Sequence, residues 1–241
     1  MKSLKQIVYL IRKDLTLQFR TKDAVILIFV FSLLVVLVFC FIFGPVFVPF
    51  SLLKIDRQEW IKELSKLAGS VLWVAFTFSG VIGLNRSFDI ERSSGGLKGL
   101  RLAGTDPGNL YLSKVFSNAL ILFFIDICIT PIALIFFGAL EMINWVGWLK
   151  LNGVIAIGTL GFCAGGVLLA GMSSGAKGRE SLLSVILFPI LFPLIIAASK
   201  CTVSILNGKS LLEDIWLILL VGYSLIVLAV SYLLFEYIVE E

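Results

Sequence analysis

Long apolar runs alternate with short polar segments over most of the 241 residues. The six apolar segments cover approximately residues 24–50, 67–84, 115–140, 151–172, 181–199 and 214–235. Each is near or above the roughly 20 residues that a helix needs to cross the hydrocarbon core of a bilayer. The pattern therefore predicts an all-α polytopic membrane protein with six transmembrane helices, organised as one transmembrane domain over residues 1–241.

The first 23 residues follow a different pattern, in which apolar residues recur at helical spacing. Their apolar positions are Leu4, Ile7, Val8, Ile11, Leu15 and Phe19, and Lys5, Gln6, Arg12, Lys13 and Arg20 occupy the remaining surface. This spacing predicts an amphipathic helix that lies along the membrane surface with its basic side chains among lipid phosphates, not the continuous apolar core of a signal peptide. Two roles stay open: an elbow that braces a partner, or a surface anchor only.

Composition agrees with a membrane protein, because 59% of the residues are hydrophobic, 15% are charged and the mean hydropathy is +1.04. The net charge of +4 reflects basic cytoplasmic segments and does not indicate nucleic-acid binding. Histidine is absent, so the commonest metal and heme ligand is missing. The four cysteines (Cys40, Cys128, Cys163 and Cys201) form no Cys-x-x-Cys pair. We therefore expect them to be packing residues, and we expect no metal site and no tightly bound cofactor.

The distribution of Lys and Arg predicts the orientation in the membrane. Thirteen of the 20 basic residues fall in the N-terminal helix, the central polar segment and the 173–180 turn, and the other seven fall on the opposite side. Because cytoplasmic loops carry the excess of basic residues, these three regions and both termini are predicted to be cytoplasmic.

The polar segment from Leu84 to Lys114 is the densest mixture of charged, glycine and turn residues in the middle of the chain. It has the pattern of a charged helix end, a glycine break, a short amphipathic helix and a closing turn. We predict a cytoplasmic coupling loop over residues 85–114, whose helix over residues 89–102 contacts a soluble partner. The residues predicted to make this contact are Asp89, Glu91, Arg92, Gly95, Leu97, Leu100 and Arg101. An ordinary solvated loop is the alternative.

The sequence carries no recognisable catalytic motif. Gly208-Lys209-Ser210 matches only the end of a phosphate-binding P-loop, because Val203 stands where the motif needs its first glycine. Histidine, a Gly-x-Ser-x-Gly motif and a close pair of carboxylates within an apolar segment are all missing. We therefore expect no enzymatic activity in this chain, and an ATPase that drove it would be a separate chain.

Asp126 is the one ionisable residue well inside a predicted span. An acidic group at the bilayer centre costs roughly 2.5–3.5 kcal/mol on insertion scales, so it normally faces the helix bundle or a cavity. Asp126 is therefore a candidate for lining a substrate or proton path. The alternatives are a position nearer the interface, or a neutral carboxyl group hydrogen-bonded to a neighbouring helix.

Prolines and glycines mark irregular or closely packed helices. Pro131 in the third span, and Pro189 and Pro193 in the fifth, each remove a backbone hydrogen bond and predict either hinges or static kinks. In the fourth span Gly161 and Gly165 form a Gly-x-x-x-Gly pair, which lets two helices approach closely. The contact could lie at a dimer seam or inside one subunit.

Several stretches together resemble the CcmB family, also called heme exporter protein B. They are Leu72–Phe88 (LWVAFTFSGVIGLNRSF), the polar segment with Gly95, Leu97, Leu100, Pro107 and Lys114, the Thr159–Phe162 stretch with Gly165, and Leu182–Pro193 with both prolines. The last two stretches are the most specific, and the resemblance covers nearly the whole chain. Asp126 and the charged segment 54–66 have no counterpart that we can assign to the family.

The resemblance implies an ABC-2-type permease subunit in the bacterial inner membrane. It implies a homodimer that works with two copies of an ATP-binding cassette ATPase, a heme-handling membrane protein, a small membrane subunit and a periplasmic heme chaperone. Heme would be a substrate and ATP would bind the partner. Either heme transfer or release of the loaded chaperone would be the driven step.

Two other functions stay open. The first is an ABC-2-type exporter permease for another amphipathic substrate or lipid. The second is a non-transporting scaffold of the heme-handling complex.

Overall fold

The protein is described by a computed structural model over residues 2–43, 57–93, 106–172, 180–211 and 213–240. Within these ranges the chain forms α-helices and one short 3-10 helix, and it contains no β-strand. They are α1 (Lys2–Thr21), α2 (Asp23–Phe43), α3 (Arg57–Ser93), α5 (Pro107–Phe136), η2 (Leu140–Met142), α6 (Trp145–Met172), α7 (Glu180–Leu206) and α8 (Ile215–Glu240). Six of these helices, α2 to α8, are long and apolar enough to cross a membrane. The predicted all-α polytopic class is confirmed.

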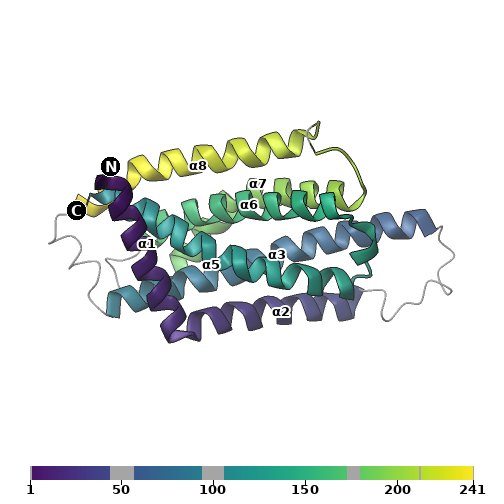
Figure 1. Cartoon of the computed structure of the whole chain (residues 1–241), viewed down its shortest axis with the longest axis horizontal. Helices are drawn as coiled ribbons and strands as arrows, with labels where there is room; N and C mark the ends of the chain where they lie inside the picture. Colours follow the sequence, from purple (N-terminus) through teal and green to yellow (C-terminus); the bar gives the residue numbers. More distant parts are fainter. Residues whose placement is uncertain (1, 44–56, 94–105, 173–179, 212, 241) are drawn as a thin grey trace.

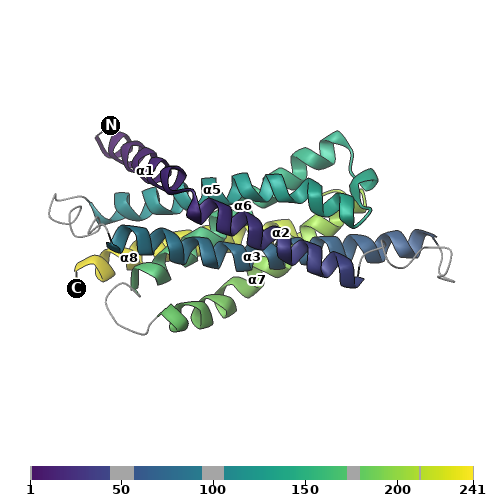
Figure 2. The same ribbon diagram turned by 90° about the horizontal axis from the view of Figure 1, so that it is seen from below.

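The six spanning helices form one elongated bundle in which successive helices run in opposite directions (Figure 1). Both termini lie at the same end of this bundle, together with the end of α3, the start of α5, the end of α6 and the start of α7 (Figures 1 and 2). We call the end of the bundle that holds both termini the terminal end. The opposite end, which carries η2, is called the η2 end. The grouping is the one that the Lys and Arg counts assigned to one side of the membrane. Which side the terminal end faces stays a prediction.

Several helices have bounds that differ from the predicted spans. Helix α3 begins at Arg57 and continues to Ser93, well beyond the predicted 67–84. Helix α5 begins at Pro107 and not near residue 115. The coupling loop predicted over residues 85–114 is therefore too long, because its first part belongs to α3 and its last part to α5. The predicted spans ended where the apolar residues end. The helices continue beyond these points because polar residues can also form the backbone hydrogen bonds of a helix.

The start of α5 is determined by a local capping interaction. The Asp106 side chain accepts a hydrogen bond from the backbone N–H of Asn109 at 3.0 Å, and Pro107 occupies the first turn. Both features favour a helix start. The cap accepts a hydrogen bond from a backbone N–H that has no partner within the helix, and proline has no N–H that would need one. The helix thus begins at the terminal end, inside the range predicted as the coupling loop.

Helix α1 lies obliquely across one face of the bundle at the terminal end (Figures 1 and 2). A single residue separates it from α2, and this residue, Lys22, has a positive φ of 55° that redirects the chain. The side chains of α1 that face the bundle are Leu10, Asp14 and Gln18. Half of the predicted apolar stripe, Leu4, Val8 and Phe19, is exposed and free to contact lipid, whereas Ile7, Ile11 and Leu15 are half-buried.

Glycines of α6 let neighbouring helices approach closely. A Cβ at Gly158 would meet the indole ring of Trp73 on α3, with the ring atom Cζ3 at 2.6 Å. A Cβ at Gly166 would meet Leu84 of α3, and one at Gly171 would lie 2.9 Å from the Phe235 ring of α8. These small residues let α6 pack between α3 and α8, as is typical of helices in lipid.

Side-chain hydrogen bonds join helices within this core. The Trp73 indole N–H donates to the Thr202 hydroxyl of α7 at 3.0 Å. The buried Tyr111 hydroxyl of α5 donates to the Ala164 carbonyl of α6 at 3.0 Å, and its ring packs against Phe235 of α8. Each bond satisfies a polar group that the apolar surroundings could not.

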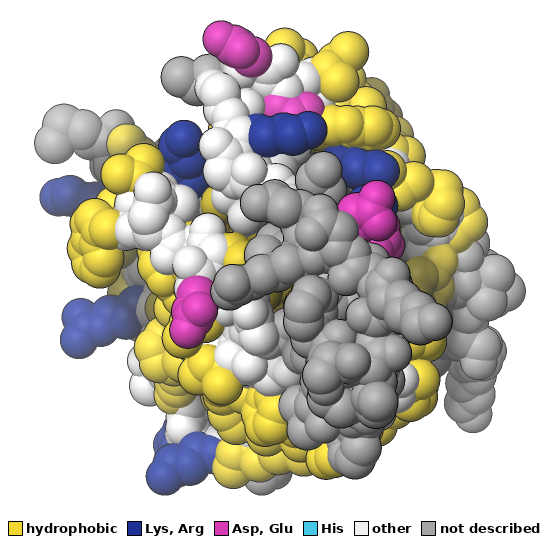
Figure 3. Space-filling model, turned by 90° about the vertical axis from the view of Figure 1, so that its right-hand side faces the viewer, with side chains coloured by type: hydrophobic (Ala, Val, Ile, Leu, Met, Phe, Trp, Pro, Cys, Tyr) yellow, Lys and Arg dark blue, Asp and Glu magenta, His cyan; other side chains and the backbone are white. Residues whose placement is uncertain are grey.

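The η2 end carries charged side chains around an apolar surface (Figure 3). Exposed residues of this end include Glu63, Lys66, Lys150, Lys200 and Lys209. Lys66 and Glu63 form an exposed ion pair, and the Lys200 ammonium lies 6.0 Å from the centre of the Trp216 ring. Such groups suit the boundary between lipid and water.

The close α6–α3 contact predicts an asymmetry between two glycines of the same helix. We expect Gly158→Leu to lower the thermal midpoint of the purified protein, because the side chain must displace Trp73 at a cost of about 1–3 kcal/mol. Gly153→Leu is the matched control, since a Cβ there meets nothing within 4 Å. Melting curves of both variants in the same detergent provide the comparison, and equal midpoints would contradict the packing described here.

Candidate coupling site

A buried ion pair joins α1 to α5 at the terminal end. The Lys114 Nζ lies 2.8 Å from the Asp14 Oδ2, and the two side chains are only 5% and 4% exposed. Lys13 adds a second cation, with its Nζ 3.1 Å from the Asp14 Oδ1. The carboxylate therefore interacts with an ammonium group through each of its oxygens, which offsets part of the cost of removing it from water.

Hydrogen bonds extend this contact on both sides of the ion pair. The side-chain amide of Gln18 donates to the Ser87 hydroxyl of α3 at 2.9 Å and to the side-chain carbonyl of Asn118 of α5 at 3.4 Å. At the other end, the side-chain amide of Asn109 donates to the side-chain carbonyl of Gln6 at 3.2 Å. We call this set the α1 clamp, and its members are Gln6, Asp14, Gln18, Ser87, Asn109, Lys114 and Asn118.

The clamp follows from helical spacing in both elements. Asp14 and Gln18 are four residues apart on α1, and Lys114 and Asn118 are four apart on α5. Residues at this spacing share one helix face, so the two helices present matching polar rows to each other. A buried ammonium group or carboxylate without a counter-charge is strongly destabilising. The Asp14–Lys114 pair therefore specifies where α1 lies on the bundle.

The clamp lies beside both ends of the predicted coupling loop. Ser87 stands two residues before Asp89, and Asn109 is the residue whose backbone N–H is bonded by the Asp106 cap. A displacement of the loop would therefore act on α3 and α5 at positions that are bonded to α1. These contacts join α1, α3 and α5 at the terminal end.

The predicted contact residues are divided by the structure. Asp89 is exposed near the end of α3, and Glu91 and Arg92 belong to the last turn of the same helix. A separate helix beginning at residue 89 is therefore wrong, because α3 continues without a break to Ser93. The remaining predicted contact residues, Gly95, Leu97, Leu100 and Arg101, lie outside the described residues.

The predicted packing and hinge residues lie within helices. A Cβ at Gly161 would meet Ser224 of α8 and Leu194 of α7, and one at Gly165 would lie 3.4 Å from Val227 of α8. The Gly-x-x-x-Gly pair therefore faces helices of the same chain. Pro131 lies inside α5, and Pro189 and Pro193 lie inside α7; whether they act as hinges stays a prediction.

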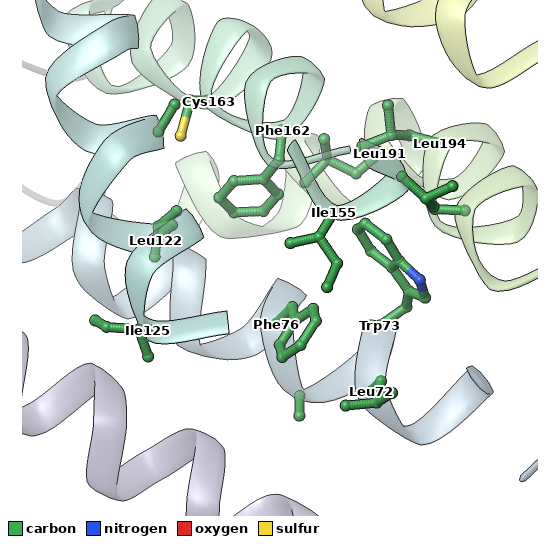
Figure 4. Close-up of a cluster of buried hydrophobic side chains, with 14 of the residues drawn as sticks. Leu72, Trp73, Phe76, Leu122, Ile125, Ile155, Phe162, Cys163, Leu191 and Leu194 are labelled. Carbon is green, nitrogen blue, oxygen red and sulfur yellow. The ribbon is translucent and has the colours of Figure 1, made fainter. Parts of the chain in front are cut away.

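Asp126 lies deep in the bundle, on the third turn of α5 beyond Lys114, and is only 1% exposed. It lines a small enclosed cavity of about 10 Å³ at the meeting of α3, α5, α6 and α7. Figure 4 shows Trp73, Phe76 and Phe162 gathered around this region. A space of this size admits no substrate larger than water, so a path-lining role for Asp126 requires another conformation and stays a prediction.

The α1 clamp was not predicted from the sequence. The hydropathy pattern places Lys114 in the loop before the third span and makes no prediction for Asp14. The signal that could have found the contact is the pairing of two polar residues at four-residue spacing in each helix. That signal is weak without the fold, because many helices carry such pairs on solvated faces.

Metal-ligating residues do not gather in the part of the chain that is described. No group of three or more His, Cys, Asp or Glu side chains there could hold a metal ion, and the whole sequence contains no histidine. The buried cysteines Cys40, Cys163 and Cys201 are free thiols in separate places.

Six apolar spans and an amphipathic helix fastened across one end define the class of this protein, a multi-pass α-helical membrane protein. The family model described as CcmB protein matches residues 5–239, which is nearly the whole chain. The chain therefore belongs to the CcmB family, and the resemblance noted in the sequence is confirmed. No curated protein matches the chain.

Family membership establishes the general function. The chain is a membrane component of the heme exporter of cytochrome c maturation, and within that ABC transporter it is the permease subunit. It works with other subunits of the exporter.

The clamp predicts a large effect from single changes and a small effect from the paired change. Asp14→Leu leaves the Lys114 ammonium buried without its carboxylate, and we expect it to cost about 3–5 kcal/mol. Lys114→Leu should be comparably destabilising. The double variant Asp14→Leu with Lys114→Leu should recover most of this loss, because neither charge then remains buried. Thermal unfolding of the purified chain in one detergent measures all three.

The exposed Lys66–Glu63 pair at the η2 end provides the control. Its side chains are 59% and 60% exposed, so Lys66→Leu should change stability by no more than about 1 kcal/mol. Single changes at Asp14 that are as mild as this control would show that the clamp contributes little.

Proposed function

We propose that this chain receives force from a separate ATP-binding cassette ATPase through the segment between α3 and α5. ATP-driven closure of an ATPase pair would displace this segment, and the α1 clamp would carry the displacement into α1, α3 and α5. The driven step is the transfer of heme, or the release of a heme-loaded chaperone on the periplasmic side. The observation that carries the proposal is that α1 is bonded on both sides of that segment, to α5 by the buried Asp14–Lys114 pair and to α3 by the Gln18–Ser87 hydrogen bond.

Coupling of this kind needs contacts that differ between two nucleotide states of the ATPase. A force applied to a free loop would be dissipated by bending of the loop. The base of this segment is bonded to a third helix by the Gln18–Ser87 and Gln6–Asn109 hydrogen bonds, which supports transmission into the bundle.

The composition and shape of α1 support a position at the cytoplasmic interface. Val8 and Phe19 are exposed along an open recess of α1, which half-buried Leu15 and the side chains of Arg12 and Arg20 also line. Apolar side chains can enter the acyl region while guanidinium groups contact lipid phosphates. In this position α1 would brace the bundle against the membrane surface while the ATPase acts from the cytoplasmic side.

The complex that we propose contains two copies of this chain and two copies of the ATPase. A heme-handling membrane protein, a small membrane subunit and a periplasmic heme chaperone complete it. Absence of histidine from this chain favours the heme-handling partner as the holder of heme iron, since histidine is a common axial ligand. We place the complex in the bacterial inner membrane with both termini of this chain in the cytoplasm.

The proposal predicts that the ATPase depends on two leucines of the coupling segment. Replacing Leu97 and Leu100 together by Asp should abolish co-purification of the ATPase and stop cytochrome c maturation, because apolar contacts with the partner are lost. Affinity purification of the tagged chain, followed by quantification of the ATPase and of c-type cytochromes, measures both effects.

A matched control places two aspartates at the opposite end of the protein. Lys209 and Ser210 are exposed there, and Lys209→Asp with Ser210→Asp should retain the ATPase. Unchanged binding and maturation in the Leu97 and Leu100 variant would remove the segment from the mechanism. Full maturation with a hydrolysis-deficient ATPase would instead indicate a scaffold.

A further inference from the structure

Asp126 is a buried carboxyl group that the proposed coupling mechanism does not use. It lies on α5 between three other helices, and its side chain is 1% exposed. Neither of its oxygens meets a hydrogen-bond partner among the described residues. An ionised carboxylate in such a place would lack both water and a counter-charge, which is costly in a helix bundle within lipid.

The polar neighbours of Asp126 in the cavity have no donor left for it. Thr77 of α3 and Thr159 of α6 line the same cavity. Thr77 donates its hydroxyl hydrogen to the Trp73 carbonyl at 2.7 Å, and Thr159 donates to the Ile155 carbonyl at 2.8 Å. The Trp73 indole N–H is bonded to Thr202. A hydroxyl oxygen keeps acceptor lone pairs after it has donated, so the lining offers acceptors to a donor that comes from elsewhere.

Charged groups on the surrounding helices do not meet this need. The residues that α3, α6 and α7 contribute to the cavity are all uncharged: Trp73, Phe76, Thr77, Thr159, Phe162, Leu194 and Ile195. The described spanning parts of α2 (24–43) and of α8 (215–235), which also pack on α5, contain no charged residue. On α6, the buried thiol of Cys163 forms no hydrogen bond with the carboxyl oxygens.

The size of the cavity limits the donor that it could admit. Its volume of about 10 Å³ is at the lower limit for one water molecule. Oxygen-ligated metal ions such as Ca²⁺ and Mg²⁺ take about six or more ligands, whereas the lining supplies oxygens from one carboxyl group and two hydroxyls. A proton needs no additional space and converts the carboxyl group itself into the missing donor.

The geometry points to an internal proton site in which Asp126 is a neutral carboxylic acid within the closed bundle. The acid donates its O–H to a hydroxyl oxygen of Thr77 or Thr159 through one water molecule, since no direct hydrogen bond joins the carboxyl group to either threonine. The ligand of this site is therefore a proton, and the two threonines are its positioning residues. The site is independent of the coupling segment and of the partner ATPase.

Infrared spectroscopy of the full chain, purified with its accompanying subunits, tests this assignment. At neutral pH we expect a carbonyl band of a protonated carboxyl group that shifts with ¹³C-labelled aspartate and is absent from Asp126→Asn. Thr77→Val or Thr159→Val should shift the band to higher frequency, because the acid loses an acceptor. Since labelling and the threonine variants leave Asp126 in place, the band can be assigned even if Asp126→Asn fails to fold.

Ser113→Ala is the matched control for the threonine variants. Ser113 is a buried hydroxyl of α5 that donates to its own helix, at the Leu110 carbonyl, and it does not line the cavity, so the band should not move. Carboxylate bands alone at neutral pH would overturn the proposal. Loss of the band when sodium chloride replaces choline chloride would also overturn it, by showing that a metal ion occupies the site.

Discussion

The buried contact between Asp14 and Lys114 is the interaction on which the terminal end of this protein depends. Two opposite charges are almost fully removed from solvent at a distance of 2.8 Å, and neither is tolerable there alone. The contact therefore determines which face of α1 meets the bundle. It also leaves Leu4, Val8 and Phe19 of the apolar stripe facing outward, where lipid can cover them. An amphipathic helix that packed through its apolar stripe would have no such surface for the membrane.

The rest of the bundle is held by a different kind of contact. Hydrophobic burial does not drive helix association within lipid, so close packing and a few hydrogen bonds must do so. Glycines of α6 allow the approach of α3 and α8, and the Trp73–Thr202 bond joins α3 to α7. These contacts join α3 to α6 and α7, and α6 to α8, within the membrane region, which is what the proposed coupling requires of α3.

The sequence was sufficient for the class of fold and for the family, because hydropathy and the stretches around Thr159 and Pro193 are local signals. It was not sufficient for the helix ends at the coupling segment. Lys114 appeared to belong to a loop because charged residues usually lie outside the membrane, yet it is a buried part of α5 that is neutralised by a residue 100 positions earlier. Long-range pairing of this kind leaves only a weak trace in each segment, two polar residues at four-residue spacing, which many solvated helices share. Asp126 is the reverse case, since its position in the sequence left both burial and a place nearer the interface open, and its burial without a donor became visible only in the fold.

The central claim is that the terminal end, with α1 and the base of the coupling segment, faces the cytoplasm, where an ATPase can act on it. Labelling of single cysteines in intact cells with a membrane-impermeant maleimide tests this most directly, after the native cysteines are replaced by serine. Thr16 and Asp89 are exposed at the terminal end, and Glu141 and Lys209 are exposed at the η2 end. The account predicts that Glu141→Cys and Lys209→Cys react in intact cells, and that Thr16→Cys and Asp89→Cys react only after the membrane is permeabilised. The reverse pattern would contradict it, since a cytoplasmic ATPase could not then reach the clamp.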